Sequence, residues 1–186
     1  KEKAEVSIPL NTDNTVCIVV DIQERLFPVL NSHQDFVEKT CQMLQGLQAL
    51  EIPLLAAEQY PKGLGHTVAS VKNQLGDTPV FEKTNFSVWQ PDAEAFIRQH
   101  QARNIILLGV EAHVCMLQTV ADLRAQGFEV YIPLECTTSR TVQNKENGLA
   151  QMQAMGAVVS NIESLLFMLL KDAKHPAFKT ISKLIQ

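Results

Sequence analysis

Short apolar runs rich in β-branched residues alternate along this chain with longer segments of helical periodicity. The clearest runs are residues 16–20, 53–57, 105–109 and 129–132, with weaker ones at 79–81 and 157–159. Helical faces lie over residues 33–50, 91–100, 114–126, 143–155 and 162–171. Runs of this length, apolar on both faces, are typical of parallel strands covered by helices. The alternation therefore predicts an α/β fold in three layers, α/β/α.

The length of the chain limits it to one folding unit. Its 186 residues fit a single domain over residues 1–186, and we find no repeat or linker that would divide it. Residues 58–78, with Gly63, Gly65 and Gly76, form the longest connection without a clear pattern, and we expect a pocket loop or lid there.

Charge and cysteine usage narrow the expected partners and location. The formal net charge is −4 and no basic run interrupts the body of the chain, so nucleic acid is not an expected partner. No apolar stretch is long enough for a membrane span, and the charged N-terminal residues do not resemble a signal peptide. We therefore expect a cytoplasmic protein without a membrane partner. Its four scattered cysteines, without metal-site spacing, are expected to be free thiols.

The tail, residues 172–186, carries an amphipathic pattern. Phe178, Ile181, Leu184 and Ile185 recur at helical spacing after Pro176. Such a helix packs either on its own subunit or on a neighbour in an oligomer, and the sequence leaves both open.

Three chemically distinct side chains follow predicted strands. Asp21 comes after the first strand, Lys83 after the third and Cys115 shortly after the fourth. The carboxyl ends of parallel strands meet at one edge of a sheet, where ligands bind. There Cys115 is a candidate nucleophile, Asp21 an acid and base, and Lys83 an electrostatic clamp.

The position of Cys115 favours a thiolate, because unpaired N–H groups surround the first turn of a helix. Backbone N–H groups in the turn of residues 109–115 are candidate donors to an oxyanion. Structural roles are also open: Asp21 as a helix cap, Lys83 as a surface residue and Cys115 as a small buried hydrophobe.

These residues carry a resemblance to a known family. The motifs are Asp21-x-Gln23 after a strand, Glu82-Lys83-Thr84-x-Phe86-Ser87, Gly109-Val110-Glu111-Ala112-His113-Val114-Cys115 before a helix, and Thr138-Ser139-Arg140. Together they resemble the isochorismatase-like cysteine hydrolases, which include nicotinamidases and N-carbamoylsarcosine amidohydrolases. The resemblance extends from Val16 to about Leu170.

The resemblance implies an isochorismatase-like fold, with a six-stranded parallel sheet of order 3-2-1-4-5-6, and a triad of Asp21, Lys83 and Cys115. It also implies a cis peptide bond between Val110 and Glu111, with the N–H groups of Glu111 and Cys115 forming an oxyanion hole. Members of the family form dimers or larger rings, so a homo-oligomer is expected.

The chain departs from the nicotinamidase pattern where those enzymes bind a metal. They carry an aspartate and two histidines after the second strand, whereas the matching stretch here holds only His66. A catalytic metal usually needs three protein ligands, so we expect no metal and no cofactor. The presence of Cys115 favours hydrolysis of an amide over the vinyl ether chemistry of isochorismatases.

Position alone suggests the residues that surround the substrate. The candidates are Gln23, Phe27, Phe86, Trp89 and His113. Trp89 is also a candidate for packing in the core or an interface, and His113 for a helix cap. Glu111 either binds an amine group of the substrate or faces solvent. We therefore expect a cysteine-dependent hydrolase of a small amide-like C–N substrate acting through a thioester. The alternative is a catalytically silent binding or assembly protein with the same fold.

Overall fold

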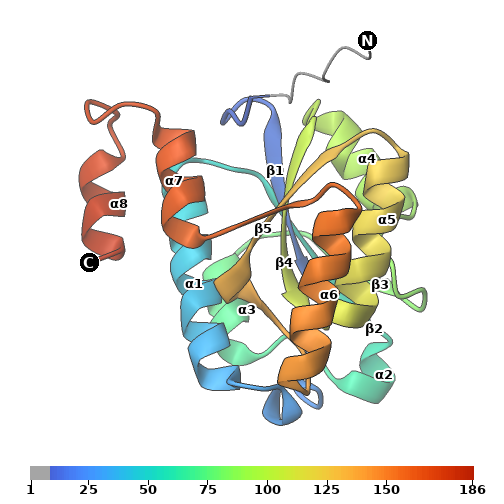
Figure 1. Ribbon diagram of the computed structural model, residues 1–186. Helices are drawn as coiled ribbons and strands as arrows, with labels where there is room; N and C mark the ends of the chain where they lie inside the picture. Colours follow the sequence, from blue (N-terminus) through green and yellow to red (C-terminus); the bar gives the residue numbers. More distant parts are fainter. Residues whose placement is uncertain (1–8) are drawn as a thin grey trace.

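The computed structural model describes residues 9–186 as a parallel sheet between two layers of helices (Figure 1). The strands are β1 (Thr15–Val20), β2 (Leu54–Gln59), β3 (Val80–Lys83), β4 (Asn104–Val110), β5 (Glu129–Pro133), β6 (Thr137–Thr138) and β7 (Val158–Ser160). Their order is β3-β2-β1-β4-β5-β7, and β6 pairs with the end of β4. The order expected from the resemblance is confirmed, but the sheet has seven strands where six were expected.

Helices cover both faces of this sheet. The α-helices are α1 (His33–Ala49), α2 (Pro61–Leu64), α3 (Ala69–Leu75), α4 (Pro91–Gln99), α5 (Leu117–Ala125), α6 (Val142–Ala154), α7 (Ile162–Leu170) and α8 (Phe178–Leu184). Two 3-10 turns, Phe27–Val29 and Leu134–Cys136, and a π-helical turn, Ala112–Met116, complete the connections.

Side-chain alternation along β1 explains the two layers. Cys17 and Val19 point into a core shared with α1, α3 and α7, while Val16, Ile18 and Val20 point into a second core under α4, α5 and α6. Successive residues of a strand face opposite sides, so a fully apolar strand supplies both cores. Figure 1 shows α1 and α7 on one side of the sheet and α4, α5 and α6 on the other.

The additional strand, β6, pairs Thr137 with Gly109 and Thr138 with Val110. It occupies the place beside β4 that β5 leaves free, because β5 pairs only with residues 104–106. A strand of two residues is too short to show an alternation of apolar and polar side chains, so the sequence pattern does not reveal it. It brings Ser139 and Arg140 to the end of β4.

The connection over residues 58–78 is more ordered than its sequence suggests. Glu58 and Gln59 still belong to β2, and most of the remainder forms α2 and α3. Val71 and Leu75 of α3 are buried in the core beside α1. This segment is therefore not the irregular loop that was expected.

The amphipathic tail forms α8 and packs on the chain's own body. Ile181 is fully buried, and Gln42 of α1 donates a hydrogen bond from Nε2 to the Leu184 carbonyl oxygen at 2.7 Å. Figure 1 shows α8 outside α1 and α7. The intramolecular alternative therefore accounts for the buried side of this helix.

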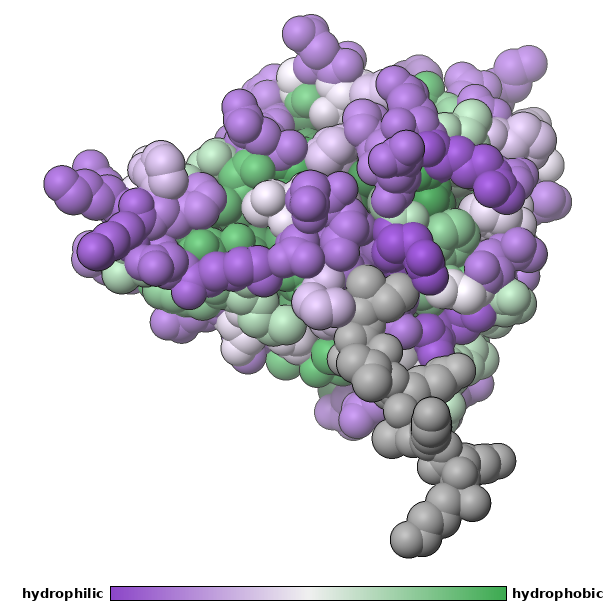
Figure 2. All heavy atoms as spheres, turned by 90° about the horizontal axis from the view of Figure 1, so that it is seen from above, coloured by the Kyte–Doolittle hydropathy of each residue, from purple (hydrophilic) through white to green (hydrophobic). Residues whose placement is uncertain are grey.

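The molecule has a mainly hydrophilic surface when seen from the edge opposite the carboxyl ends of the strands (Figure 2). Apolar residues show there as separate patches between hydrophilic ones. None of the helices within residues 9–186 has the length and apolar character needed to cross a membrane.

Candidate active site

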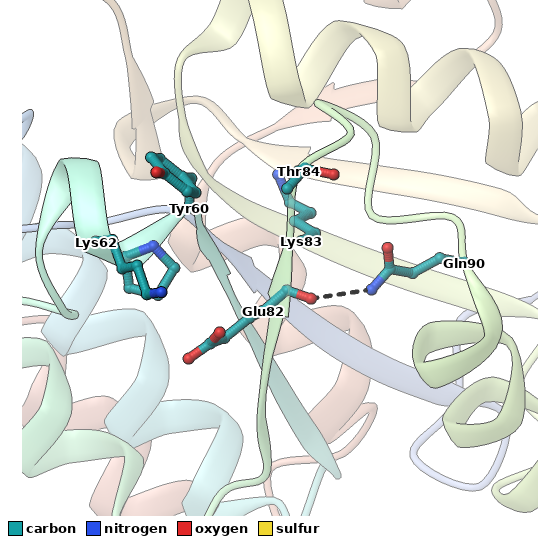
Figure 3. A pocket seen from close by; sticks show the side chains of 7 residues that line it. Tyr60, Lys62, Glu82, Lys83, Thr84 and Gln90 are labelled. Atoms are coloured by element: carbon teal, nitrogen blue, oxygen red, sulfur yellow. Dashed lines mark hydrogen bonds between the residues drawn. The ribbon is translucent and has the colours of Figure 1, made fainter.

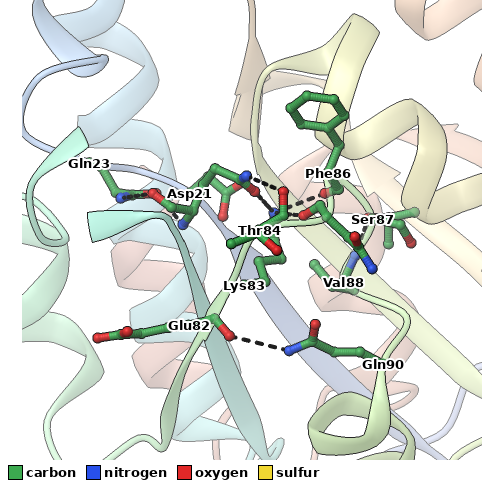
Figure 4. Close-up of polar contacts among 12 residues, drawn as sticks. Asp21, Gln23, Glu82, Lys83, Thr84, Phe86, Ser87, Val88 and Gln90 are labelled. Atoms are coloured by element: carbon green, nitrogen blue, oxygen red, sulfur yellow. Dashed lines mark hydrogen bonds and ion pairs between the residues drawn. The ribbon is translucent and has the colours of Figure 1, made fainter. Parts of the chain in front are cut away.

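The carboxyl edge of the sheet brings Asp21 and Lys83 into direct contact. Asp21 directly follows β1, and Lys83 is the last residue of β3, two strands away. Lys83 Nζ donates to Asp21 Oδ2 at 2.8 Å, so its long side chain spans the end of β2 (Figure 4). Their side chains are 0% and 1% exposed, which makes this a fully buried ion pair.

The Lys83 ammonium has further acceptors around it. It donates to Gln59 Oε1 at 2.6 Å and to the Phe86 carbonyl oxygen at 2.8 Å, with the Asn85 carbonyl oxygen at 3.2 Å. Asp21, in contrast, keeps one free oxygen: its Oδ1 is buried and has no hydrogen-bond partner among residues 9–186. A buried carboxylate oxygen without a donor is uncommon and can accept a proton or hydrogen bond from a reacting group.

Cys115 lies in the π-helical turn that follows β4, 7% exposed. π-helical turns inside helices are rare and often occur at functional sites. Asp21, Lys83 and Glu111 are all near enough to alter the pKa of its thiol. The three residues predicted to form the triad therefore meet at one place.

Glycine at position 109 allows the ends of β1 and β4 to approach each other. Gly109 pairs with Val20, has φ of +123°, and a Cβ there would overlap the Val20 carbonyl oxygen. Asp21 itself has φ of +56°, a left-handed conformation that Asp tolerates better than most residues. The local backbone thus turns Asp21 out of β1 beside the end of β4.

Burial governs the protonation of the two groups. It raises the pKa of Cys115 well above the ordinary value; the Asp21 charge raises it further, and Lys83 opposes both. Burial likewise raises the pKa of Asp21, again against the effect of Lys83. Burial and the nearby carboxylate therefore act against the thiolate that the position before a helix favours, and the Lys83 ammonium acts for it.

The turn before Cys115 contains the cis peptide bond that the resemblance implied, between Val110 and Glu111. The Glu111 carboxylate is nearly buried, and its Oε2 accepts from the backbone N–H of Arg140 at 3.0 Å and from Arg140 Nε at 3.1 Å. Glu111 therefore does not face solvent. It joins the turn to the residues that follow β6.

Two polar residues of the predicted pocket are already engaged. Gln23 is fully buried, and its Nε2 donates to the carbonyl oxygens of Gln59 at 2.9 Å and Gly65 at 2.8 Å. Its Oε1 accepts from the Gln59 N–H at 2.7 Å. His113 is half-buried, and its Nδ1 lies 2.9 Å from Ser139 Oγ.

The predicted aromatic residues take different places. Phe27 packs partly on the core beside α1. Trp89 packs against the other core and against Phe128, with ring centroids 5.8 Å apart. Phe86 is 49% exposed, and only its carbonyl oxygen contacts Lys83.

A cavity of about 400 Å³ opens beside Lys83 (Figure 3). Its lining residues are Tyr60, Pro61, Lys62, Glu82, Lys83, Thr84 and Gln90. None of the predicted aromatic pocket residues lines this cavity. Tyr60 lies in the connection over residues 58–78, and the sequence does not indicate its place in the lining because an isolated tyrosine carries no distinguishing pattern.

The stretch compared with the nicotinamidase metal site forms a closed polar cluster. Glu58 accepts from Thr67 N at 2.6 Å, from Thr67 Oγ1 at 2.7 Å and contacts His66 Nδ1 at 3.0 Å. Burial opposes ionisation of Glu58, but these hydrogen bonds prevail and lower its pKa. Within residues 9–186, no three potential ligand side chains gather as a metal site would require.

Known proteins match this chain over most of its length. The family model described as "Isochorismatase domain" matches residues 15–164. Isochorismatase domain-containing protein 1 of Salmo salar is 39% identical over 96% of this chain, and its counterpart in Danio rerio is 38% identical over 95%. The chain spans 67% and 62% of the length of these two relatives.

Solved structures share the fold. One described as the MAR1 ribonuclease of Caenorhabditis elegans is 35% identical, with a TM-score of 0.92 over 96% of this chain and 92% of that one. The YcaC protein of Escherichia coli, described as an octameric hydrolase of unknown specificity, superposes with a TM-score of 0.89 over 98% of this chain and 91% of that one. At 16% identity, the second likeness concerns the fold alone.

Proposed function

We propose that this chain, which belongs to the isochorismatase domain family, is a hydrolase that uses Cys115 to cleave a small amide-like C–N bond. The observation that carries the proposal is the nearness of the Asp21 carboxyl to the Cys115 thiol, with Asp21 Oδ2 held by Lys83 and Asp21 Oδ1 left without a partner among the described residues. A cysteine with an adjacent base is the arrangement that nucleophilic catalysis requires.

The reaction follows from these positions. Cys115 Sγ attacks the carbonyl carbon while its proton passes to Asp21 Oδ1. The C–N bond of the tetrahedral intermediate breaks, Asp21 gives the proton to the leaving nitrogen, and ammonia or an amine departs from a thioester. Asp21 then takes a proton from water, whose oxygen attacks the thioester carbon. The C–S bond breaks, Asp21 returns the proton to the Cys115 sulfur, and the acid leaves.

Two further elements belong to the proposal. The N–H groups of Glu111 and Cys115 stabilise the oxyanion, because the turn places both residues at the end of β4. Lys83 stabilises the negative charge shared by Asp21 and Cys115. The residues predicted around the substrate, among them Phe86 and His113, remain candidates for specificity.

The wider expectations also remain proposals: a single domain over residues 1–186, a cytoplasmic homo-oligomer, a small-molecule substrate and no need of a metal or cofactor. The octamer described for the YcaC protein is consistent with an oligomer. Light scattering of the purified protein measures its size.

A second candidate function comes from the structure described as a ribonuclease, at 35% identity. Against it stand the net charge of −4 and the burial of Lys83, since RNA binding depends on accessible basic groups. RNA cleavage is therefore tested as a separate activity.

The test compares wild type with Cys115→Ala on a panel of small amides, with ammonia release as the readout, and on a labelled RNA oligonucleotide. Cys41→Ala, which removes a half-buried thiol elsewhere, is the control. We expect ammonia release that Cys115→Ala abolishes and Cys41→Ala keeps. Equal inactivity of wild type and Cys115→Ala on amides, with ligand-induced thermal stabilisation retained, would favour a silent binding protein.

A further inference from the structure

Two glutamines connect the two strands that carry the ion pair, β1 and β3, with β2 between them. Gln23 lies two residues after Asp21, and Gln59 is the last residue of β2. Gln23 exchanges two hydrogen bonds with the backbone of Gln59, and Gln59 Oε1 accepts from Lys83 Nζ. A closed ring of contacts therefore runs from Asp21 to Lys83, Gln59 and Gln23 and back along the chain to Asp21.

The first glutamine acts where β1 has already left the sheet. β1 and β2 pair from Cys17 with Leu54 to Val20 with Ala57. Beyond that point, the Gln23 side chain bonds to both the N–H and the carbonyl oxygen of Gln59. A side-chain amide thus replaces the backbone of β1 as the partner of β2, and it fixes Gln59 by two bonds.

The second glutamine has only one orientation that satisfies its neighbours. Its Nε2 donates to the Thr84 carbonyl oxygen at 2.7 Å, so its Oε1 is the atom that faces Lys83. The Thr84 carbonyl oxygen can only accept a hydrogen bond and the Lys83 ammonium can only donate one. The Gln59 amide therefore cannot flip without losing both bonds.

Lys83 has three N–H donors, and its three shortest contacts are to Asp21 Oδ2, Gln59 Oε1 and the Phe86 carbonyl oxygen. Of these, one is the charged partner and one is backbone. Gln59 is therefore the single neutral side chain that determines where the ammonium points.

We infer that Gln59, held by Gln23, is a positioning residue that aims the Lys83 ammonium at Asp21 and so sets the reactivity of Cys115. The inference rests on the proposed function, because it assigns a role to these amides in preparing the nucleophile. Gln59 acts through Lys83 and touches no reacting atom. Gln23 acts through Gln59.

The test is the pH dependence of iodoacetamide labelling at Cys115, read by peptide mass spectrometry in Gln59→Met, which keeps the length of the side chain but removes the amide. The control is Gln42→Met, the same substitution on α1, which loses one side-chain hydrogen bond to a backbone carbonyl oxygen, just as Gln59→Met loses the bond to Thr84, but leaves Lys83 untouched. Thermal unfolding of each protein shows that both are folded.

We expect the labelling profile of Gln59→Met to move to higher pH, so that labelling near neutral pH slows about three- to tenfold. The control keeps the wild-type profile. A purely structural role for Gln59 would lower the melting temperature without moving the profile. Gln59→Asn, which withdraws the oxygen by one carbon, is expected to shift in the same direction and serves if Gln59→Met does not fold.

A Gln59→Met profile that overlies wild type, while Cys115 remains the most reactive cysteine of the wild type, would overturn the inference and leave the proposed function intact. If Cys115 of the wild type instead reacts no faster than Cys17 or Cys136, the proposed function fails, and the positioning role fails with it.

Discussion

Lys83 Nζ lies 2.8 Å from Asp21 Oδ2 in the interior, with neither side chain exposed by more than 1%. Removing one member of a buried ion pair leaves the other without compensation, and the cost is about 3–5 kcal/mol. This pair therefore ties the stability of the fold to the proposed chemistry.

The first prediction concerns this coupling. Lys83→Met and Asp21→Asn are each expected to lower the free energy of unfolding, Lys83→Met by about 3–5 kcal/mol because it leaves the Asp21 carboxyl unpaired. The double variant is expected to be more stable than the sum of the single effects predicts. Urea unfolding of the four proteins measures the coupling, and strictly additive losses would show that the pair contributes nothing to stability.

The raised pKa of Asp21 predicts that the rate of Cys115 labelling falls at acidic pH. Asp21 accepts a proton only as a carboxylate, so labelling of Cys115 is expected to rise with pH around a midpoint above 3.8, the ordinary value. A raised folded-state pKa means that the stability from this group is complete below the pKa of the unfolded carboxyl and is lost as pH rises through the folded one.

Labelling rates between pH 3 and 8 check this prediction, with Asp21→Asn as the variant that cannot titrate. Its profile is expected to lack this fall. A wild-type midpoint at or below 3.8 would mean that Lys83 outweighs burial at this carboxyl.

Glu111 supplies a second test of the electrostatics. Its charge is among the causes that raise the pKa of Cys115, so Glu111→Gln is expected to speed labelling about twofold at constant pH. The amide oxygen can still accept from Arg140, which preserves the turn. Slower labelling than in wild type would indicate that the variant disturbs the turn itself.

Gly148 sets how closely α6 approaches the turn that carries Cys115. A Cβ at this position would lie 2.9 Å from the Ala112 carbonyl carbon and from the His113 nitrogen. Replacing Gly by Ala inside a helix normally stabilises a protein, but here we expect a loss of about 1–3 kcal/mol from overpacking, together with altered labelling of Cys115. Asn147→Ala, at the neighbouring exposed position, is the control. Thermal unfolding shows whether Gly148→Ala raises or lowers the stability of the protein.

Regular patterns in the sequence predicted the central strands and the residues at their ends. Apolar runs such as residues 16–20 and 105–109 fix the central strands within one or two residues, and the positions directly after strands identify Asp21 and Lys83. β6 was missed because two residues carry no period. The role of Gln59 was missed because it depends on contacts with Gln23 and Lys83, which lie 36 and 24 positions away.

The burial of Cys115 was missed for a related reason. Its place before a helix indicated nearby N–H groups, which favour a thiolate, whereas the extent of burial and the adjacent Asp21 charge emerge only in the folded chain. Local position therefore identified Cys115 but not the surroundings that raise the pKa of its thiol.

In the proposed mechanism, Asp21 acts as the base for Cys115. The most direct measurement is iodoacetamide labelling of all four cysteines near neutral pH in wild type and Asp21→Asn. The account predicts that Cys115 labels faster than the more accessible Cys41 in wild type, and that Asp21→Asn slows Cys115 about tenfold or more. If Asp21→Asn instead labels faster, Asp21 acts only as a charge that raises the thiol pKa, and the proposed mechanism is contradicted.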